Sequence, residues 1–236
     1  MPFFRHRPLR FGAVGLVVVA LLSATSACAD DAPSTPPGDA AADRSPSTAV
    51  MSRKDVNGDG VRDVTFYRVL RGDRVRISVR TGDGSPASRV LDTSMWPGRG
   101  GAWLGAAPID GEAGVELVVG TAQGAHTPLS TVLTMRAGRL RILPNPAAQT
   151  AQWWTDAFAG GFAGWTRRTR GDEVRMSFTV VLRVGDTHRW TGTRDTFVWD
   201  DGWRSAGSRQ VMLRGDQAAL EVSGWRVRGL PRGYGG

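Results

Sequence analysis

Short runs in which apolar and polar residues alternate fill most of the chain after residue 60. Val75, Ile77 and Val79, for example, alternate with polar or charged neighbours, as in a β-strand with one buried face. Turns rich in Gly and Asp separate the runs. The pattern predicts an all-β fold of antiparallel strands and hairpins, with an incomplete propeller-like or double-sheet architecture. Predicted strands cover residues 61–70, 74–80, 88–95, 129–136, 139–143, 162–168, 173–184, 188–199, 203–213 and 218–227.

One stretch departs from this alternation. Residues 147–158 have the best helical composition beyond residue 50, although Trp153-Trp154 would also suit a strand or a packed loop. At most one short helix is therefore expected. We divide the chain after residue 50 into a β-repeat region, 51–146, and a second β-rich half, 147–236, which could belong to the same domain.

The amino terminus has the pattern of an export signal. Arg5, Arg7 and Arg10 form a basic region, and an apolar run of twelve residues, 11–22, follows it. About twenty apolar residues are needed for a helix that spans a bilayer, so this run is too short for a permanent anchor. Residues 1–27 are predicted to be a cleaved signal peptide.

The only cysteine, Cys28, follows a series of small residues. The sequence SATSAC at residues 23–28 resembles a bacterial lipobox, in which the cysteine receives a diacylglyceryl group and becomes the new amino terminus. The alternative is ordinary cleavage that leaves a free thiol. The resemblance implies a lipid anchor on the outer face of the cytoplasmic membrane or in the cell envelope. Residues 28–50, rich in Pro, Ala and Ser, are predicted to be a disordered tether.

Charge narrows the range of partners. The formal charge is +8, and removal of residues 1–27 lowers it to +5, because that segment holds three arginines and no acids. The arginines are scattered among acids, whereas nucleic-acid binders usually cluster their basic residues. We therefore expect no nucleic-acid partner. Weak attraction to anionic cell-wall polymers is compatible with the positive charge.

The densest set of candidate ligands lies in the sequence DVNGDGVRD at residues 55–63. Calcium takes about six to eight oxygen ligands, from carboxylates, amides, backbone carbonyls and water. Gly60 would let the backbone turn, so that a carbonyl also faces the ion. The spacing predicts one structural calcium ion, and the alternative is a turn that binds nothing. The predicted ligands are Asp55, Asn57, Asp59, the carbonyl of Val61, and Asp63.

The loop begins like an EF-hand, but Phe66 stands where the bidentate glutamate would be. This variant resembles the calcium loops of FG-GAP and VCBS repeats, the β-repeats of integrin α-chain heads and of many secreted bacterial proteins. Residues 104–120 look like a second, decayed copy about 55 residues later. Its loop between Asp110 and Glu116 is two residues shorter by this alignment. We expect the second copy to keep the fold and not the ion.

Nine tryptophans raise a second binding hypothesis. Most of them lie inside alternating strands and are expected to fill the core. Rings on an exposed surface would instead stack on sugars. The candidates in loop-like segments are Trp96, Trp103, Trp153 and Trp154.

Signs of catalysis are few. The histidines are isolated, and no nucleophile, zinc or phosphate-loop motif occurs. Asp110 with Glu112, or Asp156 with either, could form a glycosidase pair, but scattered carboxylates are more often surface charge. The sequence therefore predicts a non-enzymatic binding or scaffolding module at the bacterial cell surface, with a cell-wall polymer or a surface protein as partner. A wall-glycan module is the first alternative, and a glycosidase-type hydrolase the second.

Overall fold

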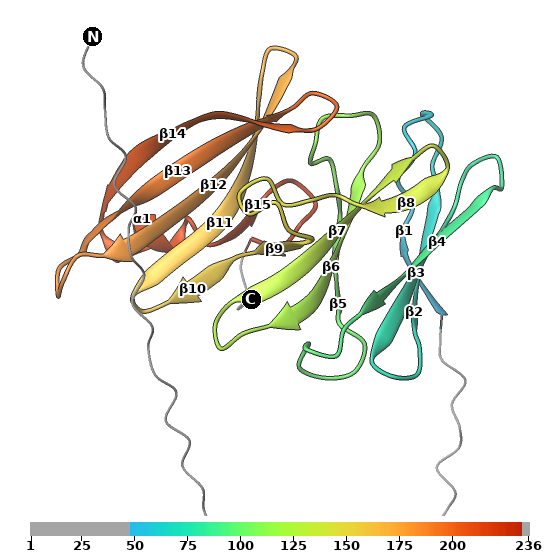
Figure 1. The fold of residues 1–236 in the computed structure, drawn as a ribbon, viewed down its shortest axis with the longest axis horizontal. Coiled ribbons are helices and arrows are strands. Elements are labelled where there is room, and N and C mark those ends of the chain that lie inside the picture. Colours follow the sequence, from blue (N-terminus) through green and yellow to red (C-terminus); the bar gives the residue numbers. More distant parts are fainter. Residues whose placement is uncertain (1–47, 233–236) are drawn as a thin grey trace, which may run out of the picture. The chain divides into compact units, whose positions relative to one another are not determined.

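The computed structural model describes residues 48–232, and their strands form three sheets (Figure 1). The fold is all-β, with antiparallel hairpins throughout, one parallel strand pair and one short helix. The predicted signal peptide, Cys28 and most of the predicted tether lie outside the described residues. Within 48–232, no helix has the length and apolar character needed to span a membrane.

The first sheet is a four-stranded meander in which each strand pairs with the next one along the chain. Its third strand alternates between surface positions and the buried residues Val75, Ile77 and Val79, as the sequence predicts. The strands are β1 (Thr48–Ser52), β2 (Val64–Val69), β3 (Arg74–Arg80) and β4 (Pro86–Asp92).

Strand β1 begins inside the predicted tether, so that prediction is wrong for residues 48–50. The side chains of these three residues are exposed. They belong to the sheet because β1 pairs with β2, with Thr48 opposite Arg68 and Val50 opposite Phe66. An edge strand held by its backbone needs no apolar pattern, which is why composition alone did not reveal it.

The second sheet repeats the same meander and adds one strand beside β7. Its strand β6 is buried along nearly its whole length because both of its faces are covered. Val118 packs into the largest core cluster, whereas Leu117 and Val119 pack into the cluster shared with the first sheet. The strands are β5 (Ala102–Ala107), β6 (Glu116–Gln123), β7 (Pro128–Arg136), β8 (Arg139–Ile142) and β9 (Gln152–Trp154).

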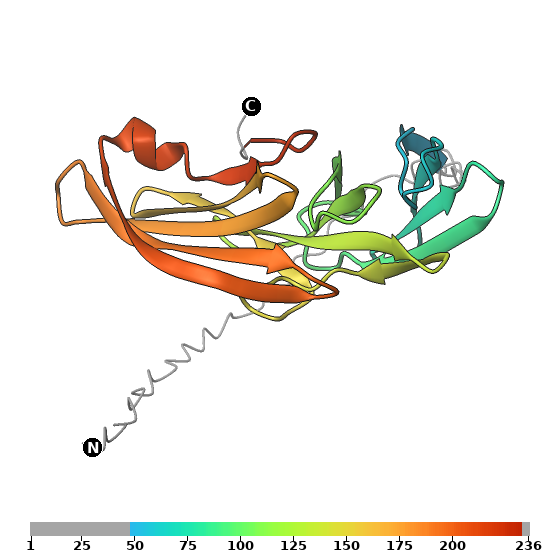
Figure 2. The same ribbon diagram turned by 90° about the horizontal axis from the view of Figure 1, so that it is seen from above.

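The third sheet contains the longest strands, which Figure 2 shows as a curved sheet. The helix α1 (Asp216–Leu220) packs on one of its faces through the buried Ala219. The last strand runs parallel to β11. The strands are β10 (Asp156–Phe158), β11 (Gly161–Arg170), β12 (Glu173–Arg183), β13 (Arg189–Trp199), β14 (Trp203–Arg214) and β15 (Gly224–Arg226).

Two element predictions are wrong. Residues 147–158 contain β9 and β10 and no helix, because Trp153 and Trp154 pair with β7. The only helix in the described chain, α1, lies partly within the predicted strand 218–227. In both places pairing or packing with distant residues decides the structure over local composition.

The two predicted halves share one core. The described residues belong to a single compact unit. The largest apolar cluster joins Val118 and Val132 of the second sheet to Trp165 and Trp225 of the third. Trp153 lies between them, with ring centroids 4.5 Å from Trp165 and 5.7 Å from Trp225. Position 146 is therefore not a boundary between separate cores.

Candidate metal centre

The loop at residues 55–63, here called the first loop, is built around the carboxylate of Asp63. This side chain is fully buried. Its Oδ2 accepts the backbone N–H groups of Val56 at 2.7 Å and Asn57 at 3.2 Å, and its Oδ1 accepts that of Gly82 at 2.9 Å. Asp63 therefore fixes the shape of the first loop and ties it to the turn after β3.

The remaining acids of the first loop lie nearer the surface. Asp55 accepts the backbone N–H groups of Gly58 at 2.6 Å and Gly60 at 2.8 Å. Both glycines have positive φ, +82° and +84°, which lets the backbone curl around this carboxylate. The amide of Asn57 donates to Asp59 at 2.8 Å. The loop thus gathers three oxygen-bearing side chains on a short, tightly turned segment.

The donors of the first loop fit calcium by type. Carboxylate, amide and carbonyl oxygens are the ligands this hard cation prefers. A carboxylate offers about four acceptor positions, so Asp63, which receives three N–H donors, keeps capacity for a cation. Among residues 48–232, no three His, Cys, Asp or Glu side chains are grouped at metal-binding distances. The predicted calcium ligands are not all of these residue types, because they include the amide of Asn57 and the backbone carbonyl of Val61.

The loop at residues 108–116, here called the second loop, has the same frame. The backbone N–H of Ile109 donates to Glu116 at 2.6 Å, seven residues later, and Val56 donates to Asp63 over the same separation. Ile109 and Val56 are both fully buried. The two loops are therefore equal in length between the donor and the closing carboxylate, and the prediction of a shorter second loop is wrong.

A second hydrogen bond confirms this correspondence. The N–H of Glu112 donates to Asp110 at 3.0 Å, just as the N–H of Asp59 donates to Asn57 at 3.2 Å. Asp110 thus takes the place of Asn57 in the frame. Pro108 then stands where the first loop has Asp55, so the second loop has no counterpart of the first predicted ligand.

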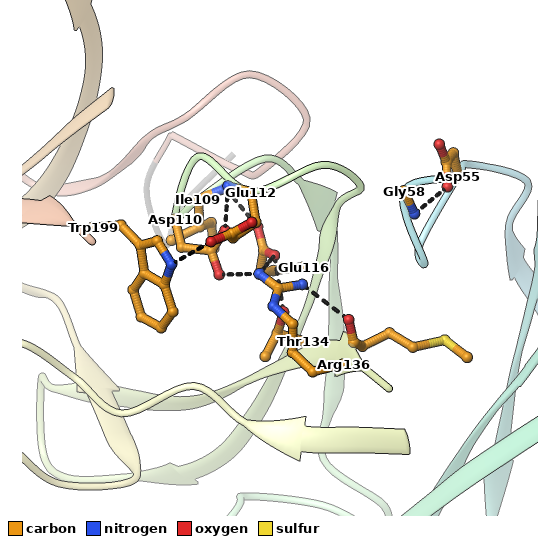
Figure 3. A network of polar contacts seen from close by, with 10 residues as sticks. Asp55, Gly58, Ile109, Asp110, Glu112, Glu116, Thr134, Arg136 and Trp199 are labelled. Carbon is orange, nitrogen blue, oxygen red and sulfur yellow. Dashed lines mark hydrogen bonds and ion pairs between the residues drawn. The ribbon is translucent and has the colours of Figure 1, made fainter. Parts of the chain in front are cut away.

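Arg136 at the end of β7 supplies a cation to the second loop (Figure 3). Its Nη2 lies 2.6 Å from Oδ2 of Asp110 and 3.9 Å from Oε1 of Glu116. The hydroxyl of Thr134 also donates to Glu116 at 3.2 Å. In the described residues, by contrast, no Arg or Lys forms a salt bridge with Asp55, Asp59 or Asp63.

Burial affects both acids of the second loop. Burial first, and then the charge of the neighbouring Asp110, raise the pKa of Glu116 to about 8, although hydrogen bonding from Ile109 and the charge of Arg136 act in the opposite direction. Burial also raises the pKa of Asp110. One guanidinium therefore does not fully offset the cost of placing two carboxylates in the interior.

The two loops contact each other directly. A Cβ atom on Gly58 would lie 2.6 Å from the carbonyl oxygen of Ala113, and one on Gly114 would lie 2.7 Å from that of Val56. Such distances are too short for a side chain, so glycine is required for the backbones to approach this closely. The two loop backbones therefore pack against each other, and a side chain at either glycine would force them apart.

The four candidate stacking tryptophans lie in different surroundings. Trp153 is fully buried, so its ring is not available to a ligand, and this corrects the prediction for it. Its indole N–H donates to the carbonyl of Leu143 at 2.9 Å. Trp154 is half-buried against the ring of Phe178. Trp96 and Trp103 are also half-buried, and Trp103 lies in β5, not in a loop.

The carboxylates considered for a glycosidase pair are divided between two hollows. Asp110 and Glu112 line one hollow together with Trp199, whose indole N–H donates to Glu112 at 2.9 Å. Asp156 lines another, where it accepts the hydroxyl proton of Thr127 at 2.6 Å. Asp156 therefore does not face either of the other two across a shared hollow.

A comparison of the sequence with models of protein families gives no match, and comparisons with curated proteins and with solved structures give none either.

Proposed function

We propose that this chain is an exported bacterial lipoprotein whose all-β domain acts as a binding or scaffolding module at the cell surface. We further propose that the first loop takes one structural calcium ion. The observation that carries the calcium proposal is the difference in counter-charge between the loops. Arg136 places a guanidinium against Asp110 and Glu116 of the second loop, whereas the three carboxylates of the first loop form no salt bridge with an Arg or Lys of residues 48–232. The resemblance of the first loop to FG-GAP and VCBS calcium loops supports the same choice.

The ion would be held by the predicted oxygens of Asp55, Asn57, Asp59, Val61 and Asp63. Its role would be structural: it would offset the repulsion between carboxylates that the loop forces together. Through Asp63 it would fix the turn after β3, and through Gly58 it would fix the second loop. Calcium sites in extracellular modules bind with dissociation constants of about 0.1–1 mM, which suits a protein outside the cytoplasm.

Unfolding of the chain with calcium and with a chelator tests the metal proposal. Calcium at a hundred times its dissociation constant should stabilise the fold by about 2.7 kcal/mol. Asp59→Ala should abolish that response. Glu112→Ala changes the corresponding residue of the second loop and should leave the response intact. If the parent protein does not respond to calcium, the first loop is a turn without a metal role.

Phase separation in a nonionic detergent tests the anchor. Expressed in a bacterium that processes lipoproteins, the parent chain should enter the detergent-rich phase, because its acyl chains contribute about 0.8 kcal/mol per buried methylene. Cys28→Ala should remain in the aqueous phase. If the two proteins partitioned equally between the phases, the proposal of a lipid anchor at Cys28 would be wrong.

A further inference from the structure

Arginine side chains line a groove beside β11 and β15. The groove has a volume of about 750 Å³, within the range of about 300–1,000 Å³ usual for small-molecule sites. Polar and apolar atoms both contribute to its walls. We call it the arginine groove. Its charged lining residues are Arg167, Arg168, Arg226, Arg228, Arg232 and a single acid, Glu221.

The strand register explains why these side chains meet. Thr166 of β11 is directly paired with Arg226 of β15. Arg168 lies two residues beyond Thr166 in the same strand, so it projects from the same face of the sheet. Two chain segments far apart in sequence therefore bring their arginines together.

The same face carries further arginines across the sheet. Gly164 of β11 is paired with Thr179, which is paired with Arg194, which in turn is paired with Arg209. Because directly paired residues project from one face, this row extends the basic surface of the groove to β13 and β14. The arginines on this face include Arg168, Arg194, Arg209 and Arg226, together with Arg175, which is paired with Arg168 in the sheet and forms an ion pair with Glu173.

Little negative charge offsets this cluster. Glu221 forms an ion pair with Arg226 at 3.0 Å. Within the described residues, no carboxylate forms an ion pair with Arg168, Arg228 or Arg232. In Arg167, which also lines the groove, Nε is buried and has no hydrogen-bond acceptor.

The nearby Arg194 is affected by the positive charge of the other arginines. Burial lowers the pKa of its guanidinium, and the positive charges of Arg209, Arg168 and Arg226 lower it further. Its Nε donates to the hydroxyl of Thr179 at 2.9 Å, a neutral partner that leaves the charge uncompensated. A bound anion would relieve this repulsion and satisfy free N–H donors.

We propose that the arginine groove binds an anion that carries several phosphate groups. The planar guanidinium presents paired N–H donors that match the oxygens of phosphate, and each pair gives two parallel hydrogen bonds. Several arginines spread along one groove need more than one phosphate to be engaged together. This site is separate from the first loop, so the proposal stands or falls independently of calcium.

Phosphate groups occur both on phosphate-bearing chains in solution and on lipid headgroups. Because the charges line a groove and not a flat surface, a flexible phosphate-bearing chain fits them better than the plane of a bilayer. The ligand we expect is therefore a linear oligophosphate or a polymer with phosphate in its repeat.

Calorimetric titration with sodium tripolyphosphate tests the proposal. The full chain carries Cys28→Ala in every sample, so that no lipid is attached, and the buffer contains a chelator, so that no calcium competes for phosphate. The test variant is Arg168→Gln with Arg228→Gln, two exposed groove residues without an ion pair. The matched control is Arg139→Gln with Arg141→Gln, which removes the same charge from exposed positions at β8.

Tripolyphosphate should bind the parent and the control equally, and the groove variant at least tenfold more weakly. Affinity should fall as salt is raised, because the attraction is electrostatic. Equal weakening in both double variants would mean attraction to net charge alone and would overturn the site. Vesicles of phosphatidylglycerol form the second arm: sedimentation with vesicles but no binding of tripolyphosphate would overturn the proposal in favour of a membrane surface.

Discussion

The first and second loops share a backbone frame but differ in the source of their positive charge. In each loop a buried apolar residue, Val56 or Ile109, donates its N–H to a carboxylate seven residues later. The second loop adds a guanidinium from a neighbouring strand, while the acids of the first loop form no salt bridge with any Arg or Lys in the described part of the chain. The difference teaches that one loop frame can be built with or without an arginine beside its closing carboxylate, and that the arginine supplies the positive charge that we propose a metal ion supplies in the first loop.

Removing the internal cation should have the largest effect. Arg136→Met leaves the buried acids Asp110 and Glu116 without a guanidinium, and breaking a buried pair typically costs about 3–5 kcal/mol. Urea unfolding of the variant should show a loss of this size. In the Arg136→Met background, Asp110→Asn with Glu116→Gln should recover most of it, because the uncompensated charges are gone. A loss below about 1 kcal/mol would mean that Arg136 has no such role.

The raised pKa of Glu116 makes the second loop sensitive to pH. Its folded pKa of about 8 lies above the value of about 4.3 for an unperturbed glutamate. The folded state therefore holds the proton more tightly. The stabilisation is fully present below about pH 4.3 and is lost as pH rises towards 8.

Glu116→Gln should remove this pH dependence because an amide does not titrate, and its oxygen can still accept the N–H of Ile109. Chemical unfolding of both proteins at several pH values between 4.5 and 8 measures the effect. Asp59→Asn, which removes one carboxylate from the first loop, is the control variant for these measurements. A parent and a Glu116→Gln variant with parallel stability curves would contradict the prediction.

Two glycine variants distinguish the energetic cost of disturbing the contact between the loops from the cost of backbone strain. Gly58 and Gly60 have nearly equal positive φ, so alanine should cost each position a similar strain of about 1–2 kcal/mol. Gly58→Ala would also force a Cβ against the backbone of Ala113, whereas nothing lies near the corresponding atom at Gly60. We expect Gly58→Ala to be destabilising by about 2 kcal/mol more in thermal unfolding. Equal losses would mean that the loops can move apart freely.

The smallest expected effect is on calcium affinity, when the charge of one predicted ligand is changed. Asn57→Asp should raise calcium affinity by up to about tenfold, since affinity in such loops follows the number of charged ligands. It also replaces the amide that donates to Asp59 with a repelling carboxylate, so the variant should be less stable without calcium. Calcium titration monitored by intrinsic fluorescence measures the affinity, and thermal unfolding with a chelator measures the stability without calcium. An unchanged or weaker affinity would contradict the proposed ligand set.

Much of the fold was predictable because hairpins carry local signals. The bounds of β3 follow from strict alternation between two glycine-containing turns, and they are confirmed. The strands β9 and β10 were not predictable, because Trp153 and Trp154 are held by pairing with β7, far away in sequence. The helix α1 was hidden for a similar reason: it is short and is fixed by the packing of Ala219.

The candidate site was predictable only in part. The spacing of oxygens marked the first loop, but not that Asp63 is buried and holds three backbone N–H groups. Aligning the loops on their first acids gave a wrong length, whereas Val56 and Ile109 give the true frame. Nothing in the sequence around Arg136 sets it apart from the other strand arginines, because its partners come from another loop.

The position of β15 has a consequence for the order in which the chain can fold. Trp225, Val227 and Leu230 belong to the largest core cluster, yet ribosomes make them last among its members. The two earlier meanders can pair their own strands during synthesis, but this core stays open until the final residues emerge. The core between the second and third sheets therefore closes only after β15 has been synthesised, long after the strands of the first meander have been made.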